Sequence, residues 1–403
     1  GDRRAVQRGL VVLQVALAFV LLTASALMAR TFVALRQVPL GFDAAHALMF
    51  KTALPPATYA GAADVVRFLD RLTQQLARLP GVQTVGVTDL LPLEQTAGSL
   101  GAVWAEGDES PQREIPPARP LVTVSSDYFR ALGIPLLSGR AFRDEPLERT
   151  PNEVVVSAAF ARQMWGERGE QEALGRRVRL LPDAPWLTVV GVVGSIRDAG
   201  LGREPSPIVY LPIGFDRGLD TAVPRVARVV VRTAGEPITL AAAARREVAA
   251  LDATLPVYDL QPMEQLVRRS MARTSFTALL LAIAAGVALA LGAIGLYGIV
   301  AYTVGMRRRE IGLRIALGSP PAVVSRLLLR QGAVLAALGV GVGLVAALAV
   351  TRVLEALLYG VSPTSPVVLA SAAALLLVVV LGASWIPAWR ASRVDPASVL
   401  SAE

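Results

Sequence analysis

Four long runs without a charged side chain divide this chain of 403 residues. They cover residues 9–29, 274–306, 331–351 and 356–389. Each run can cross a bilayer, because a helix of about 20 apolar residues spans the roughly 30 Å hydrocarbon core. Buried helices of a large soluble core are disfavoured, since the mean hydropathy of the whole chain is +0.51. The pattern predicts four transmembrane helices, the last at about 367–389.

Arginines flank these runs unequally. Arg3, Arg4 and Arg8 precede the first run, a charged segment at 306–330 joins the second to the third, and further arginines follow the fourth. One topology places all of these on the same side, which the positive-inside rule assigns to the cytoplasm. We therefore expect a multi-pass protein with both termini in the cytoplasm. Residues 37–270 then form one large domain outside, between the first and second transmembrane helices.

The residues between the first two runs read as a mixed α+β domain. Predicted strands lie at 47–54, 82–88, 121–124, 153–157, 176–180, 187–193, 208–211 and 227–232. Predicted helices lie at 59–79, 127–132, 158–165 and 239–251. Proline-rich segments at 111–120 and 205–224 indicate two lobes, one formed by about 45–120 plus 225–270 and the other inserted at about 121–224. The predicted fold class is an α+β membrane protein with four transmembrane helices and a two-lobed domain between helices one and two.

Composition removes most catalytic chemistry. The chain has a net charge of +8, no cysteine and one histidine, His46. Disulfides and thiolate chemistry are therefore excluded, and a histidine-rich metal site nearly so. Lys51 is the only lysine, and the arginines gather at membrane flanks or are scattered, which argues against nucleic-acid binding. We expect no cofactor, no metal site and no catalytic residue.

Several segments carry a family resemblance. REIGLRIALGS (309–319), LLLRQG (327–332), LLYGVSPTSP (357–366) and PAWRASRVDPASVL (387–400) resemble the permease subunits of MacB/FtsX-type ABC transporters. SSDYFRALGIPLLSGRAF (125–142) and WLTVVGVVGSIRDAGL (186–201) resemble the periplasmic core domain of that family. The domains implied are a cytoplasmic N-terminus with helix one (1–36), a periplasmic core domain (37–270) and an FtsX-like permease domain (271–403).

A closer likeness is to the second half of the duplicated orphan permeases typical of Acidobacteria, in which one polypeptide holds two four-helix units. The start at Gly1, without methionine, leads us to expect an excised second half. The localisation implied is the bacterial inner (plasma) membrane.

The resemblance implies a permease subunit that couples ATP hydrolysis by a separate ATPase to a periplasmic conformational change. Such mechanotransmission serves export or extraction of a substrate. One alternative is a non-transporting regulatory protein of the FtsX type that signals to a periplasmic partner; another is a membrane-anchored enzyme, for which no nucleophile, base or metal set is visible. A P-loop would need G-x-x-x-x-G-K-[ST], and Lys51 lies in no such context. The implied partners are an ABC ATPase subunit, a second permease half or a homodimer copy, a periplasmic adaptor and membrane lipids.

By resemblance, the short helix between transmembrane helices two and three docks on the ATPase. Apolar residues alternate there with arginines that can meet acidic partner groups, and a glycine ends the helix. The alternative is that these arginines only anchor the topology. The candidate docking residues, within the coupling loop 307–330, are Arg307, Arg308, Arg309, Glu310, Ile311, Leu313, Arg314, Leu317 and Gly318.

The second transmembrane helix is longer than the membrane requires. Its 33 uncharged residues reach about 50 Å, against a hydrocarbon core of about 30 Å. We therefore expect it to project as a stalk, continuous with a helix near 263–271. Small residues at Gly292, Gly295, Gly339 and Gly343 predict close helix packing, either within the chain or across a dimer seam.

Overall fold

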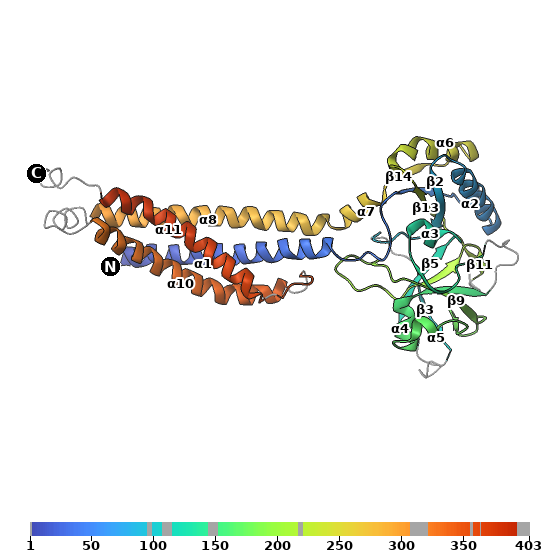
Figure 1. Cartoon of the computed structure of the whole chain (residues 1–403), viewed down its shortest axis with the longest axis horizontal. Coiled ribbons are helices and arrows are strands. Elements are labelled where there is room, and N and C mark those ends of the chain that lie inside the picture. Colours follow the sequence, from blue (N-terminus) through green and yellow to red (C-terminus); the bar gives the residue numbers. More distant parts are fainter. Residues whose placement is uncertain are drawn as a thin grey trace, which may run out of the picture. The chain divides into compact units, whose positions relative to one another are not determined.

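The computed structural model describes residues 2–94, 99–106, 115–143, 152–216, 221–306, 321–354, 358–362 and 364–392. They belong to two compact units (Figure 1). We call residues 1–37 and 272–403 the helical unit, and residues 38–271 the sheet unit.

Long helices make up the helical unit. They are α1 (Asp2–Arg36), α8 (Ala272–Met306), α10 (Pro321–Leu354) and α11 (Pro366–Ser392). Their apolar segments are Gly9–Arg36, Thr274–Met306, Gly332–Arg352 and Pro366–Pro387. Within the described residues these four helices are long and apolar enough to cross a membrane, as the charge-free runs predict.

The helix ends differ from the sequence-based limits in two places. α10 begins at Pro321, ten residues before the predicted span at 331. Arg326 and Arg330 are therefore part of the helix, which continues beyond the hydrocarbon layer. The predicted continuous stalk helix is interrupted: α7 (Met263–Ser270) ends before α8, and the N–H of Met271 donates to Arg268 O at 3.2 Å. The expectation of one unbroken helix from 263 into α8 is therefore corrected.

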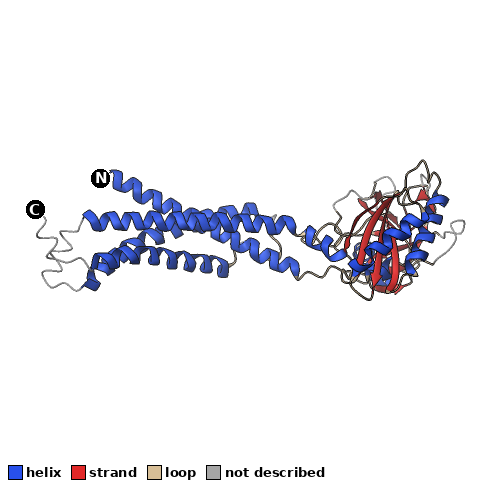
Figure 2. Cartoon of the chain, turned by 90° about the horizontal axis from the view of Figure 1, so that it is seen from above, coloured by secondary structure: helices blue, strands red, loops and turns tan. Residues whose placement is uncertain are grey.

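Twelve strands of the described chain form one mixed sheet (Figure 2). They are β1 (Ala47–Ala53), β2 (Val82–Thr88), β3 (Ser99–Ala102), β4 (Trp104–Ala105), β5 (Ala118–Val124), β6 (Leu136–Gly139), β7 (Glu153–Ser157), β8 (Arg177–Arg179), β9 (Leu187–Val193), β10 (Val209–Pro212), β13 (Val226–Thr233) and β14 (Val257–Pro262). β11 (Phe215–Asp216) and β12 (Thr221–Ala222) pair separately. The helices of the unit are α2 (Ala62–Ala77), α3 (Tyr128–Leu132), α4 (Ala158–Trp165), α5 (Gly169–Glu172), η2 (Pro237–Leu240), α6 (Ala241–Leu251) and α7.

The sheet has two halves that meet at a narrow junction. Its order is β14-β1-β13-β2-β5-β10-β7-β9-β8-β4, with β3 beside β5 and β6 beside β9. The first four strands are antiparallel, whereas β10 with β5 and β7 with β9 run parallel. β2 and β5 share one register pair, Thr88 with Val124.

Each half of the sheet has its own apolar core. In the first, Leu69, Leu72 and Leu76 of α2 are buried against β1, β2 and β13, and α6 joins them. In the second, Phe160 of α4 is buried among residues of β5, β7, β9 and β10. The second core also takes in Val103 next to β4, which the sequence assigned to the other lobe, because β4 pairs with β8.

Gly86 lets α3 lie directly on the sheet. A methyl group at this position of β2 would lie 2.8 Å from Tyr128 Cα and 2.9 Å from Ala131 Cβ. A side chain there would push the helix away, because atoms at those distances overlap. α3 accordingly packs against β2 and β13 near the junction between the two halves.

Candidate functional site

The predicted docking segment lies between α8, which ends at Met306, and α10, which begins at Pro321. Its candidate residues are Arg307, Arg308, Arg309, Glu310, Ile311, Leu313, Arg314, Leu317 and Gly318. All of them lie outside the described residues, and their docking role stays a prediction.

α1 lies at the centre of the helical unit. It contacts α8, α10 and α11. In its most apolar stretch 44% of α1 is buried, whereas only 22–28% of the corresponding stretch is buried in the other three helices. Val15 and Phe19 pack in one cluster with Leu296 of α8 and Leu376 of α11. Lipid tails are as apolar as these side chains, so close van der Waals contact must hold the helices together. The residues that set how closely α8, α10 and α11 approach α1 therefore determine how the helices of this unit pack.

Two of the predicted glycines set that distance for α10. A methyl group at Gly339 would lie 2.4 Å from Val15 Cγ1 and 3.2 Å from Val12 O. One at Gly343 would lie 3.0 Å from both Ala16 O and Phe19 Cβ. The missing side chains allow the backbones of α10 and α1 to approach closely.

The two glycines of α8 differ from each other. A methyl group at Gly295 would lie 2.7 Å from Gln14 Oε1 on α1. Gly292 has no atom of another described segment within 4 Å of that position. The structure thus brings Gly295, Gly339 and Gly343 together around α1 and leaves Gly292 apart from them. A seam with a second copy stays a prediction.

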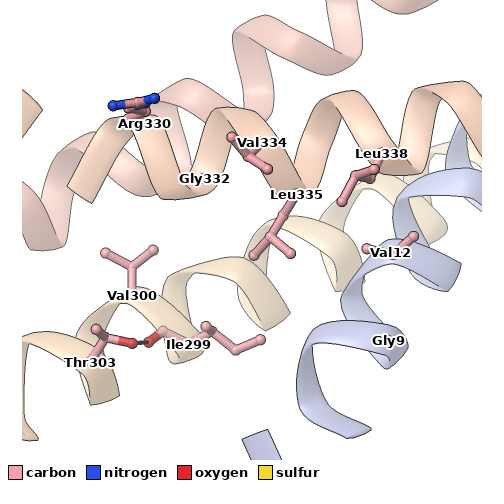
Figure 3. Close-up of a pocket in the computed structure, with 10 residues that line it drawn as sticks. All are labelled: Gly9, Val12, Ile299, Val300, Thr303, Arg330, Gly332, Val334, Leu335 and Leu338. Carbon is pink, nitrogen blue, oxygen red and sulfur yellow. Dashed lines mark hydrogen bonds between the residues drawn. The ribbon is translucent and has the colours of Figure 1, made fainter. Parts of the chain in front are cut away.

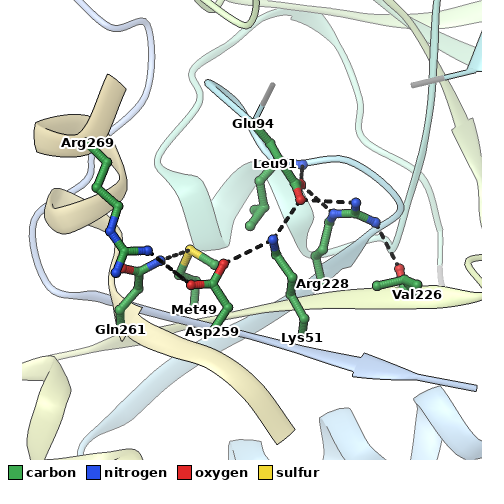
Figure 4. A network of polar contacts seen from close by, with 9 residues as sticks. All are labelled: Met49, Lys51, Leu91, Glu94, Val226, Arg228, Asp259, Gln261 and Arg269. Atoms are coloured by element: carbon green, nitrogen blue, oxygen red, sulfur yellow. Dashed lines mark hydrogen bonds and ion pairs between the residues drawn. The ribbon is translucent and has the colours of Figure 1, made fainter. Parts of the chain in front are cut away.

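Five charged side chains meet at one side of the sheet unit (Figure 4). We call them the charge network: Lys51 on β1, Glu94 in the segment after β2, Arg228 on β13, Asp259 on β14 and Arg269 on α7. They belong to five different segments of the chain. The network therefore ties together parts that lie far apart in the sequence, such as Lys51 and Asp259.

Lys51 and Glu94 form the middle of the charge network. Lys51 Nζ lies 2.7 Å from Glu94 Oε1 and 3.0 Å from Asp259 Oδ2. Arg228 donates from Nε to Glu94 Oε2 at 2.5 Å and from Nη2 to Oε1 at 3.1 Å. Arg269 Nη1 donates to Asp259 Oδ1 at 3.2 Å and extends the network onto α7.

The ionised forms of the central pair are stabilised by each other. Burial would raise the pKa of Glu94, but the hydrogen bonds and charges of Arg228 and Lys51 outweigh it and lower that pKa. Burial would likewise lower the pKa of Lys51, but Glu94 and Asp259 outweigh it and raise that pKa. The side chains of Lys51, Glu94 and Arg228 are 15%, 8% and 10% exposed, so removing one charge would leave its partners with fewer opposite charges in a site nearly out of water.

Two network residues depend on unusual backbone geometry. Leu93, directly before Glu94, has φ +63°, and Asp259 has φ +51°. Such values are uncommon outside glycine and persist only where the surroundings hold them. The N–H of Leu93 donates to Asp198 O at 2.9 Å, and Gln261 Nε2 donates to Asp259 Oδ1 at 2.7 Å. Both carboxylates are therefore held in place from outside the network as well.

The charge network was missed by sequence reasoning. The available signal was the single lysine, which interrupts the apolar strand 47–53. A charge that is buried in such a strand needs a partner of opposite charge. Its partners could not be read from the sequence, because Arg228 and Glu94 are 134 positions apart. His46 is exposed, and its Nδ1 lies 3.2 Å from Gly235 O.

Metal ligands do not gather in the part of the chain that is described: there, no three His, Cys, Asp or Glu side chains are placed to hold an ion. The charge network pairs each carboxylate with a cation. Its geometry suits holding β1, β13, β14 and α7 together.

Two family models match this chain in succession. One, described as a MacB-like periplasmic core domain, matches residues 10–251, and one described as an FtsX-like permease C-terminal matches residues 282–396. The macrolide export ATP-binding/permease protein MacB of Chromobacterium violaceum is 28% identical over 335 residues, which are 80% of this chain and 50% of that protein. MacB 2 of Aeromonas hydrophila is 26% identical over 337 residues, with the same coverage of 80% and 50%. This chain spans about half the length of these curated relatives.

Solved structures resemble part of this chain more distantly. The periplasmic region of MacB from Actinobacillus actinomycetemcomitans is 13% identical, covering 58% of this chain and 95% of that one with a TM-score of 0.36. The extracellular domain of the noncanonic ABC-type transporter YknZ from Gram-positive bacteria is 16% identical, covering 53% and 100% with a TM-score of 0.34.

The family follows from the sequence matches. The first family model alone covers more than half of the chain, and the second covers most of the remaining helices. Four helices suited to a membrane and a mixed α+β unit agree with both. The chain is a multi-pass membrane protein that belongs to the MacB/FtsX family of ABC transporter permeases.

Proposed function

We propose that this chain is the permease subunit of a MacB-type ABC transporter. In this proposal a separate ATPase hydrolyses ATP, the helical unit moves in response, and the sheet unit changes conformation to drive export or extraction of a substrate. The names of the curated relatives include both ATP binding and permease. These 403 residues contain no G-x-x-x-x-G-K-[ST] sequence, and we assign ATP binding to a partner.

The chain connectivity carries this proposal. Both connections to the sheet unit come from the two 35-residue helices: α1 ends at Arg36, with the sheet unit starting at Val38, and α8 starts at Ala272, directly after Met271. Such helices are about 52 Å long, which exceeds the roughly 30 Å hydrocarbon core. A movement of α1 would therefore reach the sheet unit through Gln37, and a movement of α8 would reach it directly at Met271.

The charge network would receive that movement. α7 lies next to α8 in the chain, and Arg269 joins it to Asp259, whose other oxygen contacts Lys51. A displacement of α7 would thus act on the ends of β14 and β1 and not on a free loop. In this proposal the two termini lie in the cytoplasm, the sheet unit lies outside, and a second permease unit completes the assembly.

The docking segment at 307–318 supplies the contact with the ATPase in this proposal. The test is co-purification of the full-length native protein with its ATPase, comparing wild type with Arg309→Glu plus Leu313→Asp. A matched control is Arg71→Glu plus Ile238→Asp, which makes the same change of charge and polarity at exposed positions of the sheet unit. We expect the ATPase to be lost from the first variant alone.

A failure of this proposal would be visible in the wild type. If no ATPase accompanies either the wild type or the control, the chain acts without a motor, as a regulatory protein would. If the ATPase stays bound to the Arg309→Glu plus Leu313→Asp variant, the docking site lies elsewhere.

A further inference from the structure

A cavity of about 510 Å³ opens between α1, α8 and α10 (Figure 3). Its wall includes Gly9 and Val12 of α1, Ile299 and Thr303 of α8, and Leu335 and Arg330 of α10. α8 and α10 each pack extensively on α1 but hardly touch each other. α11 also contacts both helices, and the cavity lies on the side where α1, α8 and α10 form its wall. Its volume falls within the roughly 300–1,000 Å³ of small-molecule sites.

The wall of the cavity is apolar with one charged end. The hydroxyl of Thr303 donates its hydrogen to Ile299 O at 2.7 Å and so does not donate it to a ligand in the cavity. Among the described lining residues Arg330 alone is charged, and its side chain is exposed. No ion pair joins it to another residue of the described chain. A molecule that fits this cavity has an apolar body and an anionic end.

Three charge boundaries place the cavity at one depth of the membrane. Gly9 follows Arg8 and begins the charge-free run of α1, while Arg330 is the last charge before the charge-free run of α10. Thr303 lies in the last turn of α8, whose charge-free run ends at Met306. All three helices thus pass from hydrocarbon to headgroup level at this end of the helical unit. The guanidinium of Arg330 is at phosphate depth, and Leu335 is at acyl-chain depth.

From this arrangement we propose that the cavity binds one anionic phospholipid. An acyl chain occupies the space between α1, α8 and α10, and the phosphate is bound by Arg330, with Arg326 one helical turn away on the same helix. A guanidinium binds phosphate through paired hydrogen bonds, and basic pockets between transmembrane helices select anionic headgroups. The membrane itself supplies this ligand. The proposal does not depend on coupling to an ATPase.

The occupant would fasten α8 to α10. Without it, α8 and α10 make few direct contacts and are joined through α1 and α11. A bound acyl chain would fill the gap with van der Waals contacts, and the headgroup would neutralise the arginine at its mouth. The anionic lipid content of the membrane would then set how firmly this end of the helical unit is held.

Native mass spectrometry of the full chain tests the proposal. The protein is taken from nanodiscs of phosphatidylcholine with added phosphatidylglycerol, and the phospholipids retained by each variant are counted. We expect wild type to retain one phosphatidylglycerol in preference to phosphatidylcholine. Arg330→Gln should weaken phosphatidylglycerol binding by about tenfold or more, the loss expected for a hydrogen bond to a charged group, and remove the preference. Leu335→Trp, which fills the cavity, should retain neither lipid.

The controls lie on the same helix. Val345→Trp adds the same bulk at an outward position that is 71% exposed, and Arg352→Gln removes an exposed arginine at the other end of α10. Both should bind as wild type does, and excess inorganic phosphate should not displace the lipid. The proposal is overturned if wild type retains no phospholipid, if Arg330→Gln keeps the full preference, or if phosphate alone displaces the lipid. Arg330→Gln decides the question even if Leu335→Trp does not fold.

Discussion

The two units of this protein use arginine in opposite ways. In the sheet unit, Arg228 pairs with Glu94 and Arg232 Nη1 lies 2.8 Å from Asp43 Oδ2. In the helical unit, Arg326 and Arg330 stand at the end of an apolar run, and neither forms an ion pair within the described part of the chain. Sheet-unit arginines thus bind the fold together. Arg326 and Arg330 of the helical unit are exposed instead.

The two units also differ in how their apolar side chains pack. The sheet unit buries apolar side chains in two cores. Each Å² of apolar surface removed from water stabilises the fold by about 25 cal/mol. The helical unit exposes large apolar side chains such as Phe276 and Ile283 outward and relies on Gly339 and Gly343 for close contact with α1. Paired charges should therefore matter most in one unit, and small residues most in the other.

The largest effect is expected from Glu94→Ala, which leaves Arg228 buried without its carboxylate and Lys51 with Asp259 alone. Removing one partner of such a network costs about 3 kcal/mol of unfolding free energy. Glu106→Ala, which removes an exposed carboxylate paired with Arg177, should cause no measurable loss. Hydrogen exchange of the β1 and β13 amides in the full chain measures both. Equal effects of the two substitutions would show that burial gives the charge network no special weight.

A somewhat smaller effect is expected from Gly339→Ala in the helical unit. The added methyl would overlap Val15 and approach Val12 O, and overpacking of this kind costs about 1–3 kcal/mol. Gly341→Ala is the matched control, since its methyl would meet no described neighbour within 4 Å. It should be neutral or stabilising by up to about 1 kcal/mol, because alanine favours helix.

Unfolding in bicelles separates these glycine variants when it is followed by the fluorescence of Trp385 and Trp389 in a background that replaces Trp104, Trp165 and Trp186 of the sheet unit with phenylalanine. If Gly339→Ala and Gly341→Ala behave alike, contact with α1 does not set the stability of the helical unit.

The smallest effect is a pH dependence confined to the sheet unit. The folded-state pKa of Glu94 is lowered from 4.5, so its contribution to stability is present above 4.5 and lost as pH falls through the folded value. The pKa of Lys51 is raised from 10.5, so its contribution is present below 10.5 and lost as pH rises through the folded value. The melting temperature of the sheet unit should fall at acidic pH and at alkaline pH, and Glu94→Gln should make the fall at acidic pH smaller. An unchanged fall at acidic pH in that variant would contradict the role given to Glu94.

Much of the local structure follows from sequence pattern alone. The strands at 82–88, 153–157 and 187–193 were predicted with the limits that the structure has, because runs of β-branched residues are bounded by turn residues. The helix predicted at 158–165 is likewise α4, and Ser157 caps it by accepting a hydrogen bond from the N–H of Phe160 at 3.2 Å.

Elements that depend on distant partners were missed. β14 contains Asp259 with a positive φ and ends in Pro262, and its pairing with β1 shifts register between Met49 and Lys51. β3 and β6 have four residues each, too few for a periodic pattern. The charge network was missed for the same reason, since the ion pairs of Lys51 and Arg228 join residues far apart in the chain. Sequence pattern reports which face is buried, but not which segments meet there.

The most direct test of the central proposal is a distance between the two units during ATP turnover. The chain has no cysteine, and spin labels at Ile238→Cys in the sheet unit and Val345→Cys in the helical unit would be unique. Labelled chains, diluted with unlabelled ones and assembled with the ATPase in nanodiscs, would be compared with and without ATP by double electron–electron resonance. We predict a shifted distance distribution with ATP that disappears in the Arg309→Glu plus Leu313→Asp background. An unchanged distribution while ATP is being hydrolysed would contradict mechanotransmission through α1 and α8.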